Sequence, residues 1–310
     1  MLPGADGLFA SVGRFLKHAG NMSLGMLIID ESGQAVPQSA LGAIYRTRRA
    51  VVVGDPLQVE PVVTIPKVLI DILADSTCVA NAYKVIENSV QTFSDNINEF
   101  NGMIGERQVG CPLVVHRRCI EPMFSISNLI SYDNRMFNKT NKKEEYLKPE
   151  NLFLIKKSGW INVEGEENGG KDHFVKNQAE RVCQLMEDAV HIYSDLFGTD
   201  DKIFIITPFR TVAESMRKFI ISYFSVKGDD KQILSKWTKN CVGTVHTFQG
   251  KDANEVLLVL GCSNKSAGAM NWVVKKANIL NVACTRAKYR IAFIGNINDW
   301  KNRRYSIYEV

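Results

Sequence analysis

Apolar residues along this chain fall into short continuous runs, separated by stretches with helical periodicity. A run of this kind between turn-forming residues is typical of a buried strand in a parallel sheet. The predicted strands are residues 26–29, 50–53, 203–206, 242–245, 255–260 and 290–295, together with residues 158–163, in which apolar and polar residues alternate.

Between these strands, apolar residues recur at steps of three and four, which is the period of an amphipathic helix. Pro37 stands where the first helix begins, because proline is favoured in the first turn. The helical positions are Ala40, Leu41, Ile44 and Tyr45, then Val175, Ala179, Val182, Met186 and Ala189, then Val212, Met216 and Phe219, and finally residues 277–288. Alternating strands and helices predict an α/β fold, with parallel sheets covered by helices on both faces.

Polar residues stand at the carboxyl ends of the predicted strands, where ligands of such sheets bind. Asp30 and Glu31 follow the first strand. One carboxylate of such a pair can hold Mg²⁺, and its neighbour can orient or deprotonate an attacking water. Taken alone, an Asp-Glu pair at this place is more often an exposed loop.

Gly54, Asp55 and Gln58 follow the second strand. Glycine lets the backbone turn close to a ligand, and a glutamine amide can hydrogen-bond a phosphate oxygen or a water. A simple Asp-Pro turn explains the same residues and is the better interpretation in isolation.

Three later segments carry basic or hydroxyl side chains. His116, Arg117 and Arg118 form a basic cluster that suits phosphate contact, or equally a solvated helix face. Residues 244–252 form a polar loop that can approach phosphate or base edges. Residues 277–288 would place Thr285 and Lys288 one helical turn apart, with Arg286 between them as a candidate arginine finger. As isolated strings, the last two segments are more often structural.

The order of these segments is far more specific than any one of them. The strings DESGQA, GDPLQ, HRRC, TPFR, TVHTFQGKD and NVACTRAK occur in this order between about residues 24 and 296. They resemble the ordered motifs of superfamily 1 helicases, and most of all those of the superfamily 1B branch that includes the nonsense-mediated-decay helicase.

The resemblance implies a RecA-like P-loop NTPase fold, use of ATP and Mg²⁺, and binding of single-stranded DNA or RNA. Residues 1–108 would be the C-terminal part of a first RecA-like domain, and residues 109–310 a nearly complete second domain. Asp30 would bind Mg²⁺ and Glu31 would activate the hydrolytic water. The γ-phosphate would be contacted by Gln58, Arg118 and Arg286. The rest of the nucleotide site would comprise Gly54, Asp55, Arg117, Gln249, Gly250 and Asp252. The nucleic-acid strand would contact Thr207, Pro208, Arg210, Thr244, His246 and Thr247.

The chain departs from the family pattern at several positions, one of which is the interruption of a Gln-Leu-Pro-Pro segment by Val59 and Glu60. Arg117 replaces a tyrosine that stacks on adenine, although a guanidinium plane also stacks. His116 replaces a glutamine, and Asp252 is one methylene shorter than the family glutamate.

A phosphate-binding loop of the form G-x-x-x-x-G-K-S/T does not occur before Asp30. The near-match from Gly165 to Lys171 is followed by Asp172, whose carboxylate would repel phosphate, and it comes after the Mg²⁺ carboxylates instead of before them. We expect it to be a decoy, and an unrelated P-loop NTPase that uses it is a third interpretation.

The favoured function is therefore the C-terminal motor portion of an ATP-dependent DNA or RNA helicase, catalytically inactive alone. A separate N-terminal half would carry the phosphate loop. The alternative is a non-catalytic module that binds nucleic acid or a protein partner. Whether this chain is itself an enzyme stays open, as does the choice between DNA and RNA.

Composition narrows the setting of this function. Apolar residues make up 45% of the 310 residues and the net charge is +5, which fits a globular protein but does not prove a nucleic-acid partner. The seven cysteines form no CxxC pair, and the apolar runs are too short to cross a bilayer. These features predict a cytoplasmic protein, or a nuclear one in a eukaryote, without a membrane partner.

Overall fold

The computed structural model describes residues 7–301, apart from residues 56, 59, 64, 81–82, 85–87, 105–106, 141–152, 170–171, 194 and 249. The chain divides into two compact units, Met1–Leu113 (unit 1) and Val114–Val310 (unit 2).

Unit 1 is built on a strand–helix–strand arrangement. Strands β1 (Leu27–Ile29) and β2 (Ala50–Val52) pair in parallel, and helix α2 (Pro37–Tyr45) connects them. Pro37 occupies the first turn of α2, as predicted. Ile29, Ala40 and Val90 form a small buried core beside these strands. The other elements of this unit are α1 (Phe9–Phe15), the 3₁₀ turn η1 (Ser32–Gln34), α3 (Lys67–Ser76), α4 (Val90–Ile97) and the antiparallel pair β3 (Gly102–Ile104) and β4 (Arg107–Val109).

Unit 2 contains a five-stranded sheet in which every pairing is parallel. Its strand order is β7-β11-β10-β8-β9. The strands are β7 (Gly159–Asn162), β8 (Ile203–Thr207), β9 (Val242–Thr244), β10 (Ala253–Val259) and β11 (Ala287–Gly295). All five residues of β8 are buried, which fits a strand covered on both faces.

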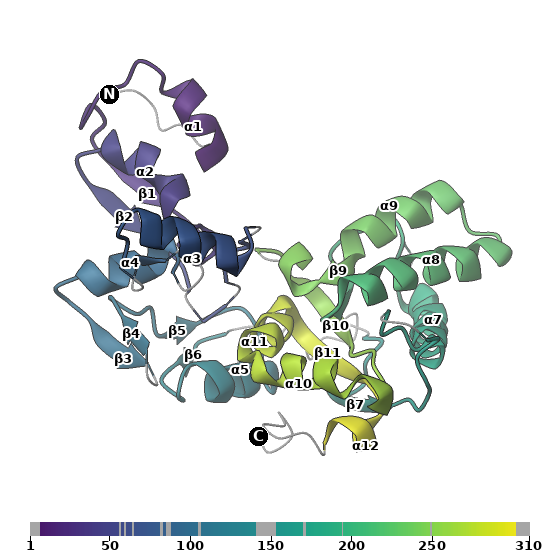
Figure 1. Ribbon diagram of the computed structural model, residues 1–310. Helices are drawn as coiled ribbons and strands as arrows, with labels where there is room; N and C mark the ends of the chain where they lie inside the picture. The colour runs from purple at the N-terminus through teal and green to yellow at the C-terminus, as the bar shows by residue number, and fades with distance from the viewer. Residues whose placement is uncertain are drawn as a thin grey trace. The chain divides into compact units, whose positions relative to one another are not determined.

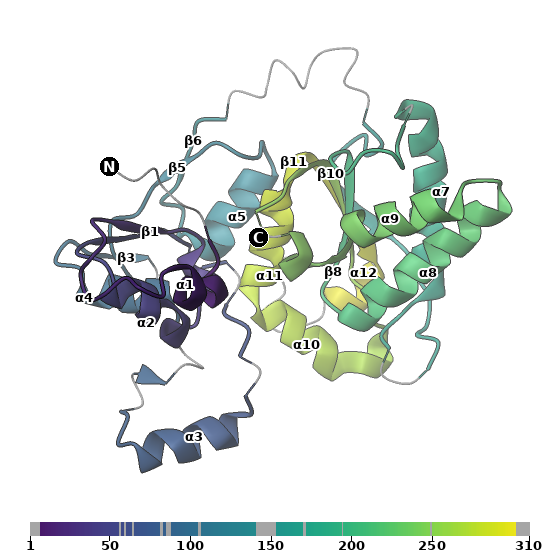
Figure 2. The same ribbon diagram turned by 90° about the horizontal axis from the view of Figure 1, so that it is seen from above.

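Helices cover both faces of this sheet, as Figures 1 and 2 show. Helices α8 (Arg210–Val226) and α9 (Lys231–Cys241) lie on one side, with α7 (Lys176–Ile192) beside α8. Helices α10 (Ala267–Lys275) and α11 (Ala277–Arg286) lie on the other side. The remaining elements are β5 (Val115–His116), α5 (Met123–Ser131), β6 (Phe137–Asn138), the 3₁₀ turns η3 (Val245–Phe248) and η4 (Asn264–Ser266), and α12 (Ile297–Trp300). The predicted α/β class with a parallel, doubly covered sheet is confirmed.

One predicted boundary is wrong. Helix α11 ends at Arg286, and β11 begins at Ala287, because Ala287 already pairs with Ala253 of β10. Lys288 therefore lies in a strand and not one helical turn beyond Thr285.

Candidate functional site

The acidic pair lies directly after β1, at its carboxyl end. Glu31 adopts a left-handed backbone with φ of +52°, which turns the chain sharply into η1. The Asp30 carboxylate accepts a hydrogen bond of 2.9 Å from the Glu31 backbone N–H. The Gln34 amide donates to Glu31 Oε2 at 2.9 Å, and both acidic residues are exposed. The turn thus presents two solvated carboxylates from one strand end.

Gly54 brings the loop after β2 against this turn. A Cβ at Gly54 would lie 2.5 Å from Ser32 Oγ and 2.8 Å from the backbone nitrogens of Ser32 and Gly33. No real Cβ atom tolerates such contacts, so only glycine fits here. The Ser32 N–H also donates to the Val53 carbonyl at 3.0 Å. The DESGQA and GDPLQ segments are therefore neighbours in space.

Asp55 organises the rest of the second loop. Its Oδ2 accepts a hydrogen bond of 2.9 Å from the Gln58 amide, and its Oδ1 accepts one of 2.9 Å from the Leu57 N–H. This is an aspartate-centred turn of a common kind. Its consequence is that Asp55 fixes the position of the Gln58 side chain.

Three residues near these loops were not predicted from the sequence. The Ser32 hydroxyl lies 2.6 Å from Gln91 Oε1, and the Gln91 amide donates to Asp95 Oδ1 at 2.7 Å. Arg107 is partly buried nearby, and burial lowers the pKa of its guanidinium, partly offset by the carboxylates of Asp95 and Asp55. Gln91 and Asp95 are one helical turn apart on α4, but no short-range pattern links them to Ser32, which Gln91 meets only through the fold of unit 1.

The basic cluster in unit 2 is shaped by its histidine. His116 Nε2 accepts a hydrogen bond of 2.9 Å from the Cys119 N–H, and it lies 3.1 Å from the Cys119 sulfur. This closes the turn that carries Arg117, which is exposed, and Arg118, which is partly buried. His116 thus has a structural use that does not require a ligand.

Two of the segments predicted to contact nucleic acid end neighbouring strands. Thr207 of β8 pairs with Thr244 of β9 at the carboxyl ends of these strands. Thr207 is buried, and its hydroxyl accepts from the Phe209 N–H at 3.4 Å. Pro208 is also buried, whereas the Arg210 side chain is 89% exposed and pairs with Glu214 at 3.0 Å. Arg210 therefore supplies an accessible positive charge at this edge.

The loop after β9 packs closely against the end of that strand and exposes two of its side chains. A Cβ at Gly243 would lie 2.6 Å from Thr247 Oγ1, so glycine permits this packing. His246 and Thr247 are both exposed. Gly250 has φ of +75°, a conformation that favours glycine. Gln249 lies outside the described residues.

The candidate arginine finger is bound inside unit 2. Arg286 is 1% exposed, and its Nη1 donates to the carbonyls of Lys251 at 3.0 Å and Phe248 at 3.3 Å. Asp252 of the same loop forms an ion pair of 2.6 Å with Lys288. The last two predicted motifs are therefore joined to one another through a buried arginine and an ion pair.

The near-match to a phosphate loop lies between β7 and α7. A Cβ at Gly165 would meet the Val175 side chain at 2.8 Å. The Asp172 carboxylate accepts from the Phe174 N–H at 3.2 Å in a turn before the helix. Gly170 and Lys171 lie outside the described residues.

These features define an α/β protein with two carboxylates beside a glycine loop, and with a parallel sheet whose strand ends carry hydroxyl and basic residues. A family model described as an AAA domain matches residues 99–298, and a second of the same description matches residues 10–65. The chain therefore belongs to the AAA-domain family, within the superfamily 1 helicases.

Curated relatives are helicases of moderate similarity. The chain is 23% identical over 284 residues to the probable helicase senataxin of Mus musculus. The aligned region covers 90% of this chain and 10% of the relative. It is 25% identical over 285 residues to the regulator of nonsense transcripts 1 homolog of Arabidopsis thaliana, with 89% of this chain and 20% of the relative covered. The chain thus spans about a tenth to a fifth of the length of these relatives.

Among solved structures, the arterivirus nonstructural protein 10 helicase in complex with DNA shares 13% sequence identity with the chain. That alignment covers 91% of this chain and 42% of the other, with a TM-score of 0.40. Such a likeness is too weak to bear on residue roles. No helix among the described residues has the length and apolar character needed to cross a membrane.

Proposed function

We propose that this chain is the C-terminal motor portion of an ATP-dependent DNA or RNA helicase. The observation that carries the proposal is the packing of Gly54 on η1, the turn directly after Asp30 and Glu31, at the carboxyl ends of two paired parallel strands. This is the edge of an α/β sheet at which ligands bind. In the proposal, units 1 and 2 correspond to a partial first and a nearly complete second RecA-like domain.

The residues after β1 fit a divalent cation and a water-activating base. Carboxylate oxygens are the ligands that Mg²⁺ prefers, and Asp30 offers one from an exposed strand end. Asp30 would hold Mg²⁺, which neutralises charge on phosphate oxygens when bound. Glu31 would accept a proton from the attacking water, while the Gln34 amide keeps its carboxylate oriented.

The other nucleotide contacts come from residues already held in place. Gln58, which Asp55 positions, would hydrogen-bond the γ-phosphate or the attacking water. Arg118 and Arg286 would supply positive charge to the γ-phosphate, and Arg117 would stack on the base. For Arg286, this role requires release from the carbonyls of the loop after β9.

The remaining assignments concern the ribose and the nucleic-acid strand. Gly250 and Asp252 would contact the nucleotide, with Asp252 leaving or sharing its ion pair with Lys288. A single strand of DNA or RNA would run over the adjacent ends of β8 and β9, touching backbone and hydroxyl groups there and the exposed Arg210.

A second candidate function is a non-catalytic module that binds nucleic acid or protein. The burial of Arg286 favours it, because a buried arginine that satisfies backbone carbonyls already has a structural role. In that case the residues of unit 2 would matter for binding, and those after β1 would be dispensable.

Hydrolysis by two forms of the protein tests these candidates. The 310-residue chain alone is expected to show no appreciable nucleic-acid-stimulated ATPase, because it lacks the amides and lysine of a phosphate loop. In a motor completed by a half that carries this loop, Glu31→Gln should abolish hydrolysis and leave ATP binding nearly unchanged, since the amide keeps the shape but loses the base.

Lys171→Ala is the matched control, with little effect expected. Loss of activity in Lys171→Ala and retention in Glu31→Gln would favour the unrelated P-loop enzyme instead. Full activity in both variants would favour a different catalytic centre altogether.

A further inference from the structure

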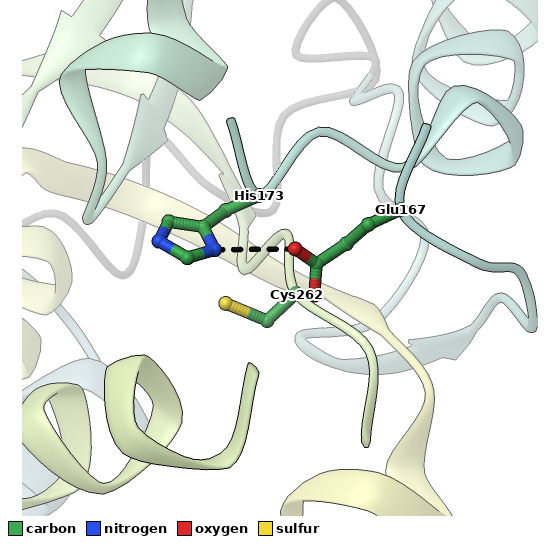
Figure 3. Close-up of side chains that lie close together, drawn as sticks. All are labelled: Glu167, His173 and Cys262. Carbon is green, nitrogen blue, oxygen red and sulfur yellow. Dashed lines mark hydrogen bonds and ion pairs between the residues drawn. The ribbon is translucent and has the colours of Figure 1, made fainter. Parts of the chain in front are cut away.

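Three potential metal ligands lie close together in unit 2, and none of them is a residue predicted to bind the nucleotide. Glu167 and His173 belong to the segment between β7 and α7, and Cys262 follows β10. One ligand atom from each of the three lies within 4.8 Å of the other two. Figure 3 shows the Cys262 sulfur beside the hydrogen bond that joins the imidazole and the carboxylate.

The carboxylate is held as a metal ligand needs to be. Glu167 is buried, and its Oε1 accepts from the Ser263 N–H at 2.7 Å and from the Ser263 hydroxyl at 3.2 Å. Its Oε2 faces His173 Nδ1 at 3.2 Å and the Ser266 hydroxyl at 2.8 Å. Both oxygens are therefore anchored by surrounding groups, as ligating carboxylates are, and the Ser266 hydroxyl lies 2.8 Å from Oε2 and 3.1 Å from His173 Nδ1.

The separation of the two polar ligands matches that of ligands around one ion. Two atoms at roughly 2.1 Å from a tetrahedral Zn²⁺ lie about 3.4 Å apart, against 3.2 Å from His173 Nδ1 to Glu167 Oε2. An ion between them would replace the present hydrogen bond. With a zinc–sulfur bond of about 2.3 Å, the sulfur would lie roughly 3.6 Å from each of the other two ligand atoms, and here it lies within 4.8 Å of both.

The backbone at two of the ligands adopts an unfavourable conformation. His173 and Cys262 both have φ of +57°, which is uncommon for residues with a side chain. The Cys262 N–H donates to the His173 carbonyl at 2.9 Å, and a Cβ at Gly261 would lie 2.7 Å from that carbonyl. Positive φ at non-glycine residues is concentrated at functional sites, and here it brings two ligands together.

We propose that Glu167, His173 and Cys262 form a binding site for Zn²⁺ or a similar borderline-soft cation. A thiolate, an imidazole and a carboxylate suit zinc and exclude magnesium as a preferred ion. Binding would release the thiol proton of Cys262, leaving a fourth position for water or the Ser266 hydroxyl. The ion would tie the segment before α7 to the end of β10.

This site would also brace the loop after β8. The His173 ring lies 4.8 Å from the Phe209 ring, and the Thr211 hydroxyl donates to the Asp172 carbonyl at 2.7 Å. A bound ion would therefore stabilise the start of α8, next to Arg210. The proposal does not depend on ATP hydrolysis.

Cobalt titration of the whole, chelator-treated chain tests the site. Co²⁺ should bind at one equivalent and give a thiolate-to-cobalt charge-transfer band, which zinc displaces and excess Mg²⁺ does not. Cys262→Ser should abolish the band. Glu167→Gln and His173→Gln should weaken cobalt binding by about tenfold or more. Cys111→Ser removes an exposed thiol and is the control that should leave the band unchanged.

Thermal unfolding provides a readout that does not depend on the sulfur. At one fixed zinc concentration, zinc should raise the melting temperature of the parent chain and of Cys111→Ser, and raise that of His173→Gln much less, because stabilisation by a ligand falls as its affinity falls. A cobalt band that survives Cys262→Ser or disappears in Cys111→Ser would overturn the proposal. So would the absence of stoichiometric binding, or an equal zinc effect on the parent chain and His173→Gln.

Discussion

Arg286 Nη1, at the end of α11, donates a hydrogen bond of 3.0 Å to the carbonyl of Lys251 in the loop before β10, and Arg286 is 1% exposed. The same nitrogen lies 3.3 Å from the Phe248 carbonyl. The buried guanidinium thus holds the loop after β9 in place, whatever it does for a nucleotide.

Arg286→Ala should destabilise unit 2, because it leaves these carbonyls without their charged donor. Hydrogen bonds to charged groups contribute about 1.5–3 kcal/mol each, so we expect a loss of that order in the free energy of unfolding. Urea unfolding measures it. Arg286→Lys retains the charge and should lose less. Equal stability of Arg286→Ala and the parent chain would show that the guanidinium does not support the loop.

Gly54→Ala should destabilise unit 1 and disturb the acidic turn. Its Cβ would lie 2.5 Å from Ser32 Oγ and close to two backbone nitrogens that cannot move independently. Forcing extra atoms into a packed site costs about 1–3 kcal/mol. Gly25→Ala, just before β1, is the control, since nothing lies within 4 Å of its Cβ. If both alanine variants unfold at the same urea concentration as the parent, the close approach of the two loops is not required.

The sequence predicted the sheet of unit 2 well where local pattern determines structure. Residues 203–206 and 256–260 are continuous apolar runs, and both became buried parts of strands in the parallel sheet. The start of β11 was missed because Lys288 and Arg290 interrupt its apolar residues, and only pairing with β10 shows that these residues are in a strand. Helix α9 was also missed, since its sequence KQILSKWTKNC is largely polar.

The candidate site was predictable only as far as its motifs. Gly54 and the acidic pair could be predicted to meet, because they end neighbouring strands of a strand–helix–strand unit. The contact of Gln91 with Ser32 and the burial of Arg286 could not, because they depend on packing between segments far apart in the chain. The same holds for Glu167 and Cys262, which are joined by no ligand spacing that a sequence search would detect.

Glu255 predicts a pH dependence of stability. This buried carboxylate accepts hydrogen bonds from the Tyr193 hydroxyl at 2.7 Å and from the N–H groups of Leu154 and Ile155 at 2.8 and 2.6 Å. Burial raises its pKa above the ordinary value of 4.5, and the hydrogen bonds offset this only in part. A raised folded-state pKa gives stability that is complete below pH 4.5 and lost as pH rises through the folded-state value.

The stability of the parent chain relative to Glu255→Gln should therefore fall as pH rises from 4.5 towards neutrality, because the glutamine does not titrate. Urea unfolding at several pH values measures this difference. Glu214→Gln, which removes an exposed carboxylate on α8, controls for the loss of one negative charge. If the parent chain instead became more stable relative to Glu255→Gln as pH rises, the pKa of Glu255 would be lowered in the folded protein.

Binding of single strands should depend on Arg210 and on salt. The Arg210 side chain is 89% exposed beside the paired ends of β8 and β9, so it is free of the burial that holds Arg286. Each phosphate contact by a basic side chain releases counterions, so affinity falls as salt rises. For single strands, the logarithm of the binding constant falls with the logarithm of the salt concentration, with a slope of about −0.7 per contact. Fluorescence anisotropy with an oligonucleotide at low salt should detect weak binding. Arg210→Ala should lower the affinity and make its dependence on salt less steep.

Lys218→Ala is the control for this variant. It removes one exposed positive charge from the same helix, two turns further on, and should change the affinity and its salt dependence much less. If the two variants weaken binding equally, the interaction reports only net charge. If binding is indifferent to salt, the edge formed by β8 and β9 does not contact phosphates.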